Sequence, residues 1–341
     1  MAARRRPTAH AVALAAAAVL AGAGGCGGDD EGDPLQVADV LQAATPATSP
    51  QATVRPAGRV LTLDAAASAI VVDPATRTLA VAVTSPDRLL LFDLASLDSA
   101  PRTMPLPGAV EQLDLGAPGE LLAPVRAAKA LLRIDIEAAE PTVRTVQLDG
   151  HPAAAATIGD RTVVAMADQV QVLAGDTVVH TVAKFEGAAD VVAVGGRAAV
   201  LDRLRTALFT IDPATGDLGP GLRAGNGATN SVGDRFGRVL VTDTRDGELL
   251  AFTADPMIMR QRYPVPGAPY AIAYDAARDL AWVTLTERNE VVGFDVAGGE
   301  PVERYRMATV RQPNAVAVDS DSGTVIVASG TGEGIQVVQH E

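Results

Sequence analysis

Leu90-Leu91-Phe92-Asp93 is the first of four stretches in which an apolar run ends on aspartate; the others are Leu132-Arg133-Ile134-Asp135, Phe209-Thr210-Ile211-Asp212 and Val292-Gly293-Phe294-Asp295. The four aspartates are 42, 77 and 83 residues apart. The two longer spacings are close to twice the first, which indicates a unit of about forty residues. Seven such units fit into the chain after residue 58. Units of this length are typical of folds in which each repeat buries its faces against its neighbours.

Residues 69–107 show the content of one unit. Apolar or β-branched runs at 69–73, 78–83, 89–94 and 102–107 alternate with turns rich in Asp, Pro, Gly and Ser. This pattern predicts a four-stranded antiparallel meander. Many of the runs lack polar alternation, as expected for strands that are covered on both faces. The sequence therefore predicts an all-β fold, a seven-bladed β-propeller with four antiparallel strands in each blade.

The last repeat shows only three strand-like runs, at 314–319, 324–328 and 335–339. The run Arg59-Val60-Leu61-Thr62-Leu63-Asp64 precedes the first inner strand and has no place in the first blade. We expect it to be the outer strand of the last blade, which closes the ring and removes exposed strand edges. The propeller then covers residues 59–341. The third and fourth repeats are the shortest, so six blades are an alternative, as is a pair of β-sandwiches.

The first 25 residues have the layout of a secretory signal peptide. Arg4, Arg5 and Arg6 precede an uncharged, alanine-rich stretch at 11–25 that is too short to span a bilayer. This stretch ends on Ala23-Gly24-Gly25, directly before Cys26, the only cysteine of the chain.

Small residues before a lone cysteine resemble the lipobox of bacterial lipoproteins. The resemblance implies that Cys26 is lipidated and anchors the protein to the extracytoplasmic side of the cell membrane. The alternative is cleavage after Ala23 and secretion of a soluble protein. Residues 26–58 contain few large apolar side chains, and we expect them to be a flexible tether.

The charge of the chain excludes one class of partner. The 341 residues carry a net charge of −13, and removal of residues 1–25, which hold three arginines and no acid, makes it more negative. Such a surface repels nucleic acid. The partners that remain are the membrane, through the lipid anchor, and an envelope protein or a small anionic ligand.

Two inner-strand segments carry a family resemblance: Gly267-Ala268-Pro269-Tyr270-Ala271-Ile272-Ala273-Tyr274-Asp275 and Gln312-Pro313-Asn314-Ala315-Val316-Ala317-Val318-Asp319. They resemble the YVTN/YncE-like family of bacterial seven-bladed propellers, with a looser likeness to NHL repeats. The resemblance covers residues 59–341 and implies the propeller fold.

Candidate chemical groups are few. Beyond the first 25 residues the histidines are His151, His180 and His340, and none has a partner at metal-ligand spacing. Aromatic residues make up 3% of the chain, so stacking platforms for a cofactor are scarce. We expect no cofactor, no metal and no catalytic residue.

A set of polar residues is expected near the centre of the ring. Asn230 and Asn314 fall on inner strands and are candidate ligand-binding residues, with Glu111 and Asp190 at blade starts nearby. Together with Asp243, the asparagines invite comparison with the metal site of gluconolactonase-like propellers. Structural hydrogen bonding within the channel is the simpler interpretation.

Basic residues recur in the loops between second and third strands, which share one face of a propeller. Five of the seven blades carry one there: Arg88, Arg126 with Lys129, Arg203 with Arg205, Arg245, and Arg288. We take Arg126, Arg203, Arg245 and Arg288 as candidate residues for binding an anion or an acidic partner. The alternative is local pairing with the neighbouring acids Asp87, Asp202, Asp246 and Glu287.

The sequence thus predicts an extracytoplasmic, lipid-anchored propeller that binds a ligand or a protein and does no chemistry. One alternative is a metal-dependent propeller hydrolase of the lactonase or gluconolactonase type. Another is a scaffold subunit of a cell-envelope complex.

Overall fold

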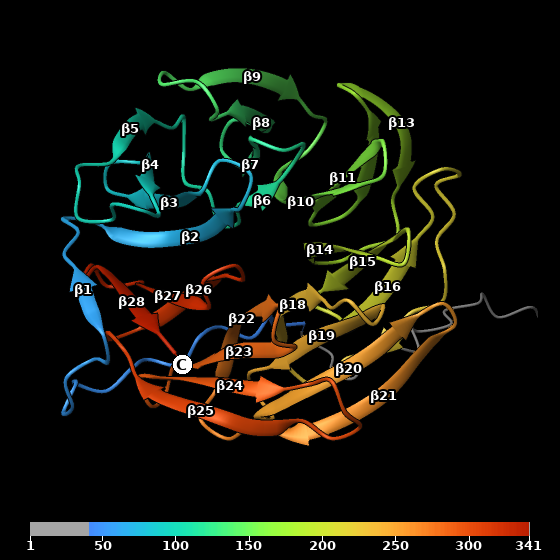
Figure 1. Cartoon of the computed structure of the whole chain (residues 1–341). Helices are drawn as coiled ribbons and strands as arrows, with labels where there is room; N and C mark the ends of the chain where they lie inside the picture. The colour runs from blue at the N-terminus through green and yellow to red at the C-terminus, as the bar shows by residue number, and fades with distance from the viewer. Residues whose placement is uncertain (1–40, 341) are drawn as a thin grey trace, which may run out of the picture. The chain divides into compact units, whose positions relative to one another are not determined.

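A computed structural model describes residues 41–340 of the chain, and all regular structure within this range is β-strand. Seven sheets, each of four antiparallel strands, are arranged in a ring (Figure 1). The predicted seven-bladed β-propeller is confirmed, and the alternatives with six blades or two sandwiches are wrong. The expected signal peptide and Cys26 lie outside the described residues. Within that range no helix is long and apolar enough to cross a membrane.

Blades 1 to 4 follow one another along the chain, each running from an inner to an outer strand. Blade 1 consists of β2 (Ala66–Asp73), β3 (Thr78–Thr84), β4 (Arg88–Asp93) and β5 (Arg102–Pro105). Blade 2 consists of β6 (Asp114–Leu115), β7 (Glu120–Val125), β8 (Ala130–Asp135) and β9 (Thr142–Gln147). Blade 3 consists of β10 (Pro152–Ile158), β11 (Arg161–Met166), β12 (Val170–Ala174) and β13 (Thr177–Val182). Blade 4 consists of β14 (Ala188–Val194), β15 (Arg197–Asp202), β16 (Ala207–Ile211) and β17 (Leu222–Arg223).

Blades 5 to 7 complete the ring, and the last of them uses strands from both ends of the described chain. Blade 5 consists of β18 (Ala228–Gly233), β19 (Arg238–Asp243), β20 (Glu248–Ala254) and β21 (Met257–Pro264). Blade 6 consists of β22 (Pro269–Asp275), β23 (Leu280–Leu285), β24 (Glu290–Asp295) and β25 (Val302–Ala308). Blade 7 consists of β26 (Pro313–Asp319), β27 (Thr324–Ser329), β28 (Ile335–Gln339) and β1 (Arg59–Leu61).

The middle strands lack polar alternation because neighbouring blades cover both of their faces. Every residue of β23 is buried, including Trp282, whereas most of the outer strand β9 is exposed. The buried side chains form clusters that join one blade to the next. Burial on both faces removes the need for an apolar and a polar side of each strand.

The aspartates that mark the repeat each close the third strand of a blade. One carboxylate oxygen of Asp93 accepts a hydrogen bond from the N–H of Ala95, two residues on, at 2.9 Å. The other three marker aspartates make the same contact: Asp135 with Glu137 (3.0 Å), Asp212 with Ala214 (2.9 Å) and Asp295 with Ala297 (3.1 Å). Such side-chain bonds to the backbone fix the start of a turn. The recurring aspartate is therefore a turn residue.

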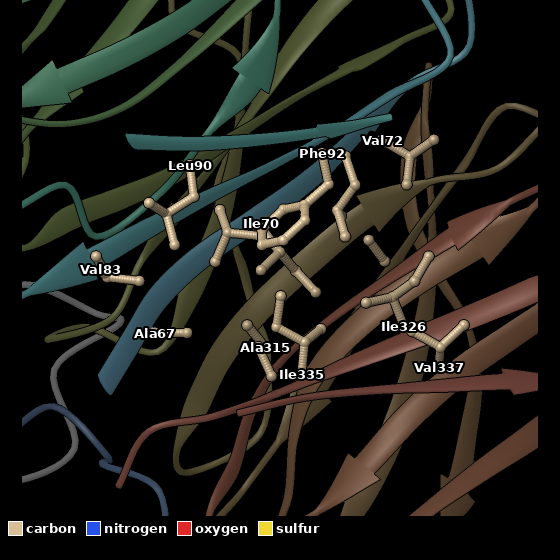
Figure 2. Close-up of a cluster of buried hydrophobic side chains, with 14 of the residues drawn as sticks. Ala67, Ile70, Val72, Val83, Leu90, Phe92, Ala315, Ile326, Ile335 and Val337 are labelled. Atoms are coloured by element: carbon tan, nitrogen blue, oxygen red, sulfur yellow. The ribbon is translucent and has the colours of Figure 1, made fainter. Parts of the chain in front are cut away.

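The N-terminal strand β1 closes the ring, as the sequence predicts. It pairs antiparallel with β28, with Arg59 opposite Val337 and Leu61 opposite Ile335. Figure 2 shows the apolar cluster at this seam, where side chains of blade 1 meet side chains of blade 7. The labelled members include Ile70, Phe92, Ala315, Ile326 and Ile335. Leu61 and Leu63 pack against the same cluster, so β1 contributes both backbone pairing and apolar contact.

Residues 42–57 differ from the expected flexible tether. This segment, here called the strap, has no regular structure but makes specific hydrogen bonds to blades 5, 6 and 7. The Oγ of Ser49 donates to the carbonyl of Thr286 at 2.5 Å and accepts from the N–H of Gln312 at 3.1 Å. Ser49 is 3% exposed. The sequence did not indicate this docking, because the bonds come from the strap backbone and from one serine. A polar linker that is exposed to solvent would have the same composition.

The closure of the ring leads to a first prediction, which compares two neighbouring residues of β1. Leu61→Asp should destabilise the protein by about 2 kcal/mol or more, because it places a charge against the apolar seam. Val60→Asp is the matched control, since Val60 is 37% exposed, and it should change stability little. Chemical denaturation measures both. Equal effects of the two substitutions would show that β1 does not hold the seam.

Candidate functional site: the central channel

The inner strands of all seven blades surround a cavity of about 430 Å³. It opens on the face formed by the loops between second and third strands and by the connections into the inner strands, here called the front face. The mouth is a hollow of about 310 Å³. β-Bulges near the start of most inner strands shape this mouth, since each leaves one extra residue out of the strand pairing. Ser68, Ala153, Ala189 and Asn314 are such residues, and all line the mouth.

A hydrogen-bond network crosses one side of the channel. Gln112 of blade 2 donates from Nε2 to one oxygen of Asp190 of blade 4 at 2.7 Å. The other oxygen of Asp190 accepts from the N–H and the Oγ of Ser231, at 2.7 and 2.8 Å. Gln112 spans blade 3, whose inner strand carries only alanine at 153–156. These small side chains leave room for the bridge, and three donors satisfy the buried carboxylate.

Asp114 is the second carboxylate of the channel and has a different environment. One of its oxygens accepts the N–H of Leu115 at 2.7 Å, and no ion pair to Asp114 occurs within residues 41–340. Burial raises the pKa of Asp114 from 3.8 to about 7; the Leu115 bond opposes the rise, and the neighbouring charge of Asp190 adds to it. The accessible part of the side chain faces the channel.

The structure places Asn230 and Asn314 in the channel, on β18 and β26 as expected. The Nδ2 of Asn230 donates to the carbonyl of Tyr270 at 2.9 Å, and its Oδ1 accepts from Arg203 at 3.0 Å. The Oδ1 of Asn314 accepts from Gln312 at 3.0 Å. Both asparagines therefore hold the mouth together.

The predicted arginines lie on the front face, but local contacts engage most of them. Arg203 reaches the mouth, where it bonds to Asn230. Arg126 pairs with Glu111 at 3.5 Å. Arg245 donates to the carbonyls of Asn226 and of Gln42 in the strap.

Arg288 is exposed, and its stem lies against Gly267, where a Cβ would come within 2.9 Å of the arginine Cδ. Most of the acids that the sequence suggested as salt-bridge partners of these arginines, Asp87, Asp202, Asp246 and Glu287, do not pair with them. Within residues 41–340, Asp202 is the one of those four that pairs with an arginine of these loops, Arg205, at 3.8 Å. Whether the four candidate arginines bind a ligand stays a prediction.

Acidic oxygens converge at one place within the described residues, and it is not the channel. The carboxylates of Asp243, Asp246 and Glu248 lie within 4.8 Å of one another in blade 5. Arg262 pairs with Asp246 at 3.4 Å and with Glu248 at 2.6 Å. Asp243 also caps the turn after its strand, where it accepts the N–H of Arg245. This group is a charge network at the turn between β19 and β20. Asp243 follows Thr242, the pairing partner of Asn230, but its carboxylate accepts the N–H groups of Asn226, Arg245 and Asp246.

The strap reaches the mouth through Gln312. The Nε2 of Gln312 donates both to the carbonyl of Ala47 in the strap, at 2.9 Å, and to Asn314. Its Oε1 accepts the N–H of Ser49 at 3.0 Å. Gln312 has a φ of 55°, a left-handed conformation that is costly for glutamine. These bonds hold it there, so the strap supports one wall of the mouth.

The sequence did not single out Asp114, Gln112 or Ser231. Asp114 resembles the strand-ending aspartates of the other repeats, such as Asp73 and Asp275, which cap the hairpin turns. The hairpin pairing shows that it stands two positions before the last pair of blade 2, Gly116 with Glu120. The turn at 117–119 has three residues, whereas the turn of blade 1 has four. This difference in turn length is the sequence feature that could have placed Asp114 within the inner strand.

Comparisons with known proteins support the fold. No protein-family model matches the chain, and no curated protein does. Among solved structures, a catalytically inactive virginiamycin B lyase variant from Staphylococcus aureus with quinupristin has a TM-score of 0.71 at 13% identity, over 83% of this chain and 99% of that one. Kuenenia stuttgartiensis hydrazine synthase has a TM-score of 0.69 at 13% identity, over 82% and 97%. A chain of the mitotic checkpoint complex has 0.72 at 9%, over 89% and 98%. At these identities the likeness concerns the propeller fold alone.

The docked strap leads to a second prediction. Ser49→Ala should lower the free energy of unfolding by about 1–2 kcal/mol, because Gln312 N–H and the Thr286 carbonyl lose a buried partner. Thr48→Ala is the matched control, since Thr48 is exposed, and it should stay within about 0.5 kcal/mol of the parent protein. Chemical denaturation compares them. No difference between the two variants would mean that the strap is not held by Ser49.

Proposed function

We propose that this protein is an exported, lipid-anchored binding protein that holds a small ligand in its central channel. The observation that carries the proposal is the cavity itself: about 430 Å³, walled by all seven inner strands and open at a polar mouth. Ligand sites are usually concave, largely apolar and supplied with a few polar groups that orient the ligand. The channel has this composition, since Val192, Val232 and Ile272 line it together with Asp114 and Asn230.

Binding is favoured over catalysis by the residue types present. Among the described residues that line the channel and its mouth there is no histidine or cysteine. Two hydroxyls of the described channel residues are bonded to carboxylates. Ser231 donates to Asp190, which is itself fully engaged by donors, and Tyr274 donates to Asp279, which Arg235 also engages. A general base next to a nucleophile would need a free acceptor there.

A channel-blocking variant tests the proposal. Ser68 lines both the cavity and the mouth, and Ser68→Trp should fill the lumen. Thr145→Trp, on the exposed outer strand β9, is the matched control. A library of small polar fragments is screened against the parent protein by ligand-detected NMR. Its hits should lose binding to Ser68→Trp by at least about tenfold and keep it with Thr145→Trp.

Thermal denaturation of both tryptophan variants shows that they are folded. The proposal would be refuted if no fragment bound, or if the folded Ser68→Trp variant bound the same fragments as the parent protein.

Export and anchoring form part of the proposal and rest on the sequence of residues 1–26. Cys26→Ser removes the sulfur that would carry the lipid. Expressed in a bacterium that processes lipoproteins, the parent protein should fractionate with the membrane and the variant with the soluble material. Membrane association that is unchanged in the variant would contradict lipidation at Cys26, and a secreted parent protein would favour ordinary cleavage.

A further inference from the structure

We propose that the ligand of the channel is a small organic cation, whose ammonium or guanidinium group binds the carboxylate of Asp114. This inference rests on the proposed function and names the chemical class that the channel selects. It is carried by the position of Asp114, by the charges of the channel wall and by the shape of the cavity.

Asp114 is the only charged residue among the seven structurally equivalent positions of the inner strands. Counted from the hairpin that follows each inner strand, the other six blades carry valine or alanine there: Val71, Ala156, Val192, Val232, Ala273 and Ala317. All seven residues line the channel. The fold is therefore satisfied by a small apolar side chain at this level, and a carboxylate there has no role in packing.

The wall around Asp114 provides negative charge and no positive charge. Of the described residues that line the cavity, Glu111, Asp114 and Asp190 are acidic and none is basic. Arg203 reaches only the mouth, where Asn230 accepts its bond. From β10, the neighbouring inner strand, only Ala156 and Thr157 reach the cavity. A partly buried carboxylate without a cation is costly, and a bound cation removes that cost.

The geometry favours an organic cation over a metal ion. Both oxygens of Asp190 are taken by Gln112 and Ser231, and one oxygen of Asp114 is taken by Leu115. Asp114 and Asp190 together thus leave one carboxylate oxygen open, and Glu111 pairs with Arg126. This is too few for a divalent cation that prefers six or more oxygen ligands. The apolar wall, which includes Ile272 and Val316, suits the hydrocarbon part of an amine.

The titration of Asp114 fits this role. Its pKa of about 7 means that the empty channel holds the carboxyl about half protonated at neutral pH. The cation binds the ionised form, so affinity should rise as the pH rises through 7. Burial is the main cause of the raised pKa, and the charge of Asp190, on β14, adds to it. Glu111 and Arg203 are the charged groups toward the mouth.

Three probes of one shape test the proposal: 2-phenylethylamine, 2-phenylethanol and phenylacetate, each titrated by calorimetry. The parent protein should bind the amine at least about tenfold more tightly than the alcohol and should not bind phenylacetate. The amine stays protonated at both pH 6 and pH 8, whereas the ionised fraction of Asp114 is about tenfold higher at pH 8. The affinity for the amine should therefore be about tenfold higher at pH 8 than at pH 6. Asp114→Asn should abolish both the preference for the amine and its pH dependence.

Controls separate this inference from the proposed function. Asp160→Asn changes an exposed aspartate outside the channel and should leave the amine affinity unchanged. If Ser68→Trp blocks the probes but Asp114→Asn keeps the amine preference, the cation inference is wrong and a channel ligand remains. If Ser68→Trp blocks none of the probes, both are wrong. Equal binding of amine and alcohol by the parent protein also overturns the inference.

Discussion

The pairing of β1 with β28 is the constraint on which the rest of the structure depends. A propeller buries each blade between two neighbours, so the ring is stable only when its first and last blades also meet. Here three residues, Arg59–Leu61, supply the fourth strand of blade 7. The apolar cluster that this seam encloses joins blades 1 and 7 as other clusters join the remaining pairs (Figure 2).

The channel is a consequence of this closure. Seven blades of four strands leave a central space that the inner strands cannot fill, and the bulges at the start of those strands turn single residues toward the mouth. Several polar residues of the channel also link one blade to another. The Gln112–Asp190–Ser231 network links blades 2, 4 and 5 across the alanines of blade 3. Asp114 differs from these residues, since it accepts a bond from the adjacent Leu115, and ligand binding at this place would draw on its carboxylate.

The strap connects the N-terminal part of the chain to this channel. Its bonds to Thr286 and Gln312 place residues 42–57 on the front face, and Gln312 passes the contact on to Asn314 at the mouth. The front-face arginines take part in the same local network, since Arg245 bonds to the carbonyl of Gln42. Contacts with backbone carbonyls thus explain part of the recurrence of arginine in these loops. The repeat pattern in the sequence did not distinguish arginines with this structural role from arginines of a charged binding surface.

The sequence by itself determined the repeat, the number of blades, the closing strand and the inner-strand positions of Asn230 and Asn314. It could do so because strand runs and turn aspartates such as Asp93 and Asp295 act within a few residues of themselves. Only the tertiary structure decided that Ser49 is buried, that Gln112 reaches Asp190 and that Asp114 faces the channel. These contacts join residues up to 263 positions apart, or depend on the length of a single turn. The linear pattern carries no signal for the first two contacts, because serine and glutamine occur equally often on exposed loops. For Asp114 the signal is the length of one turn.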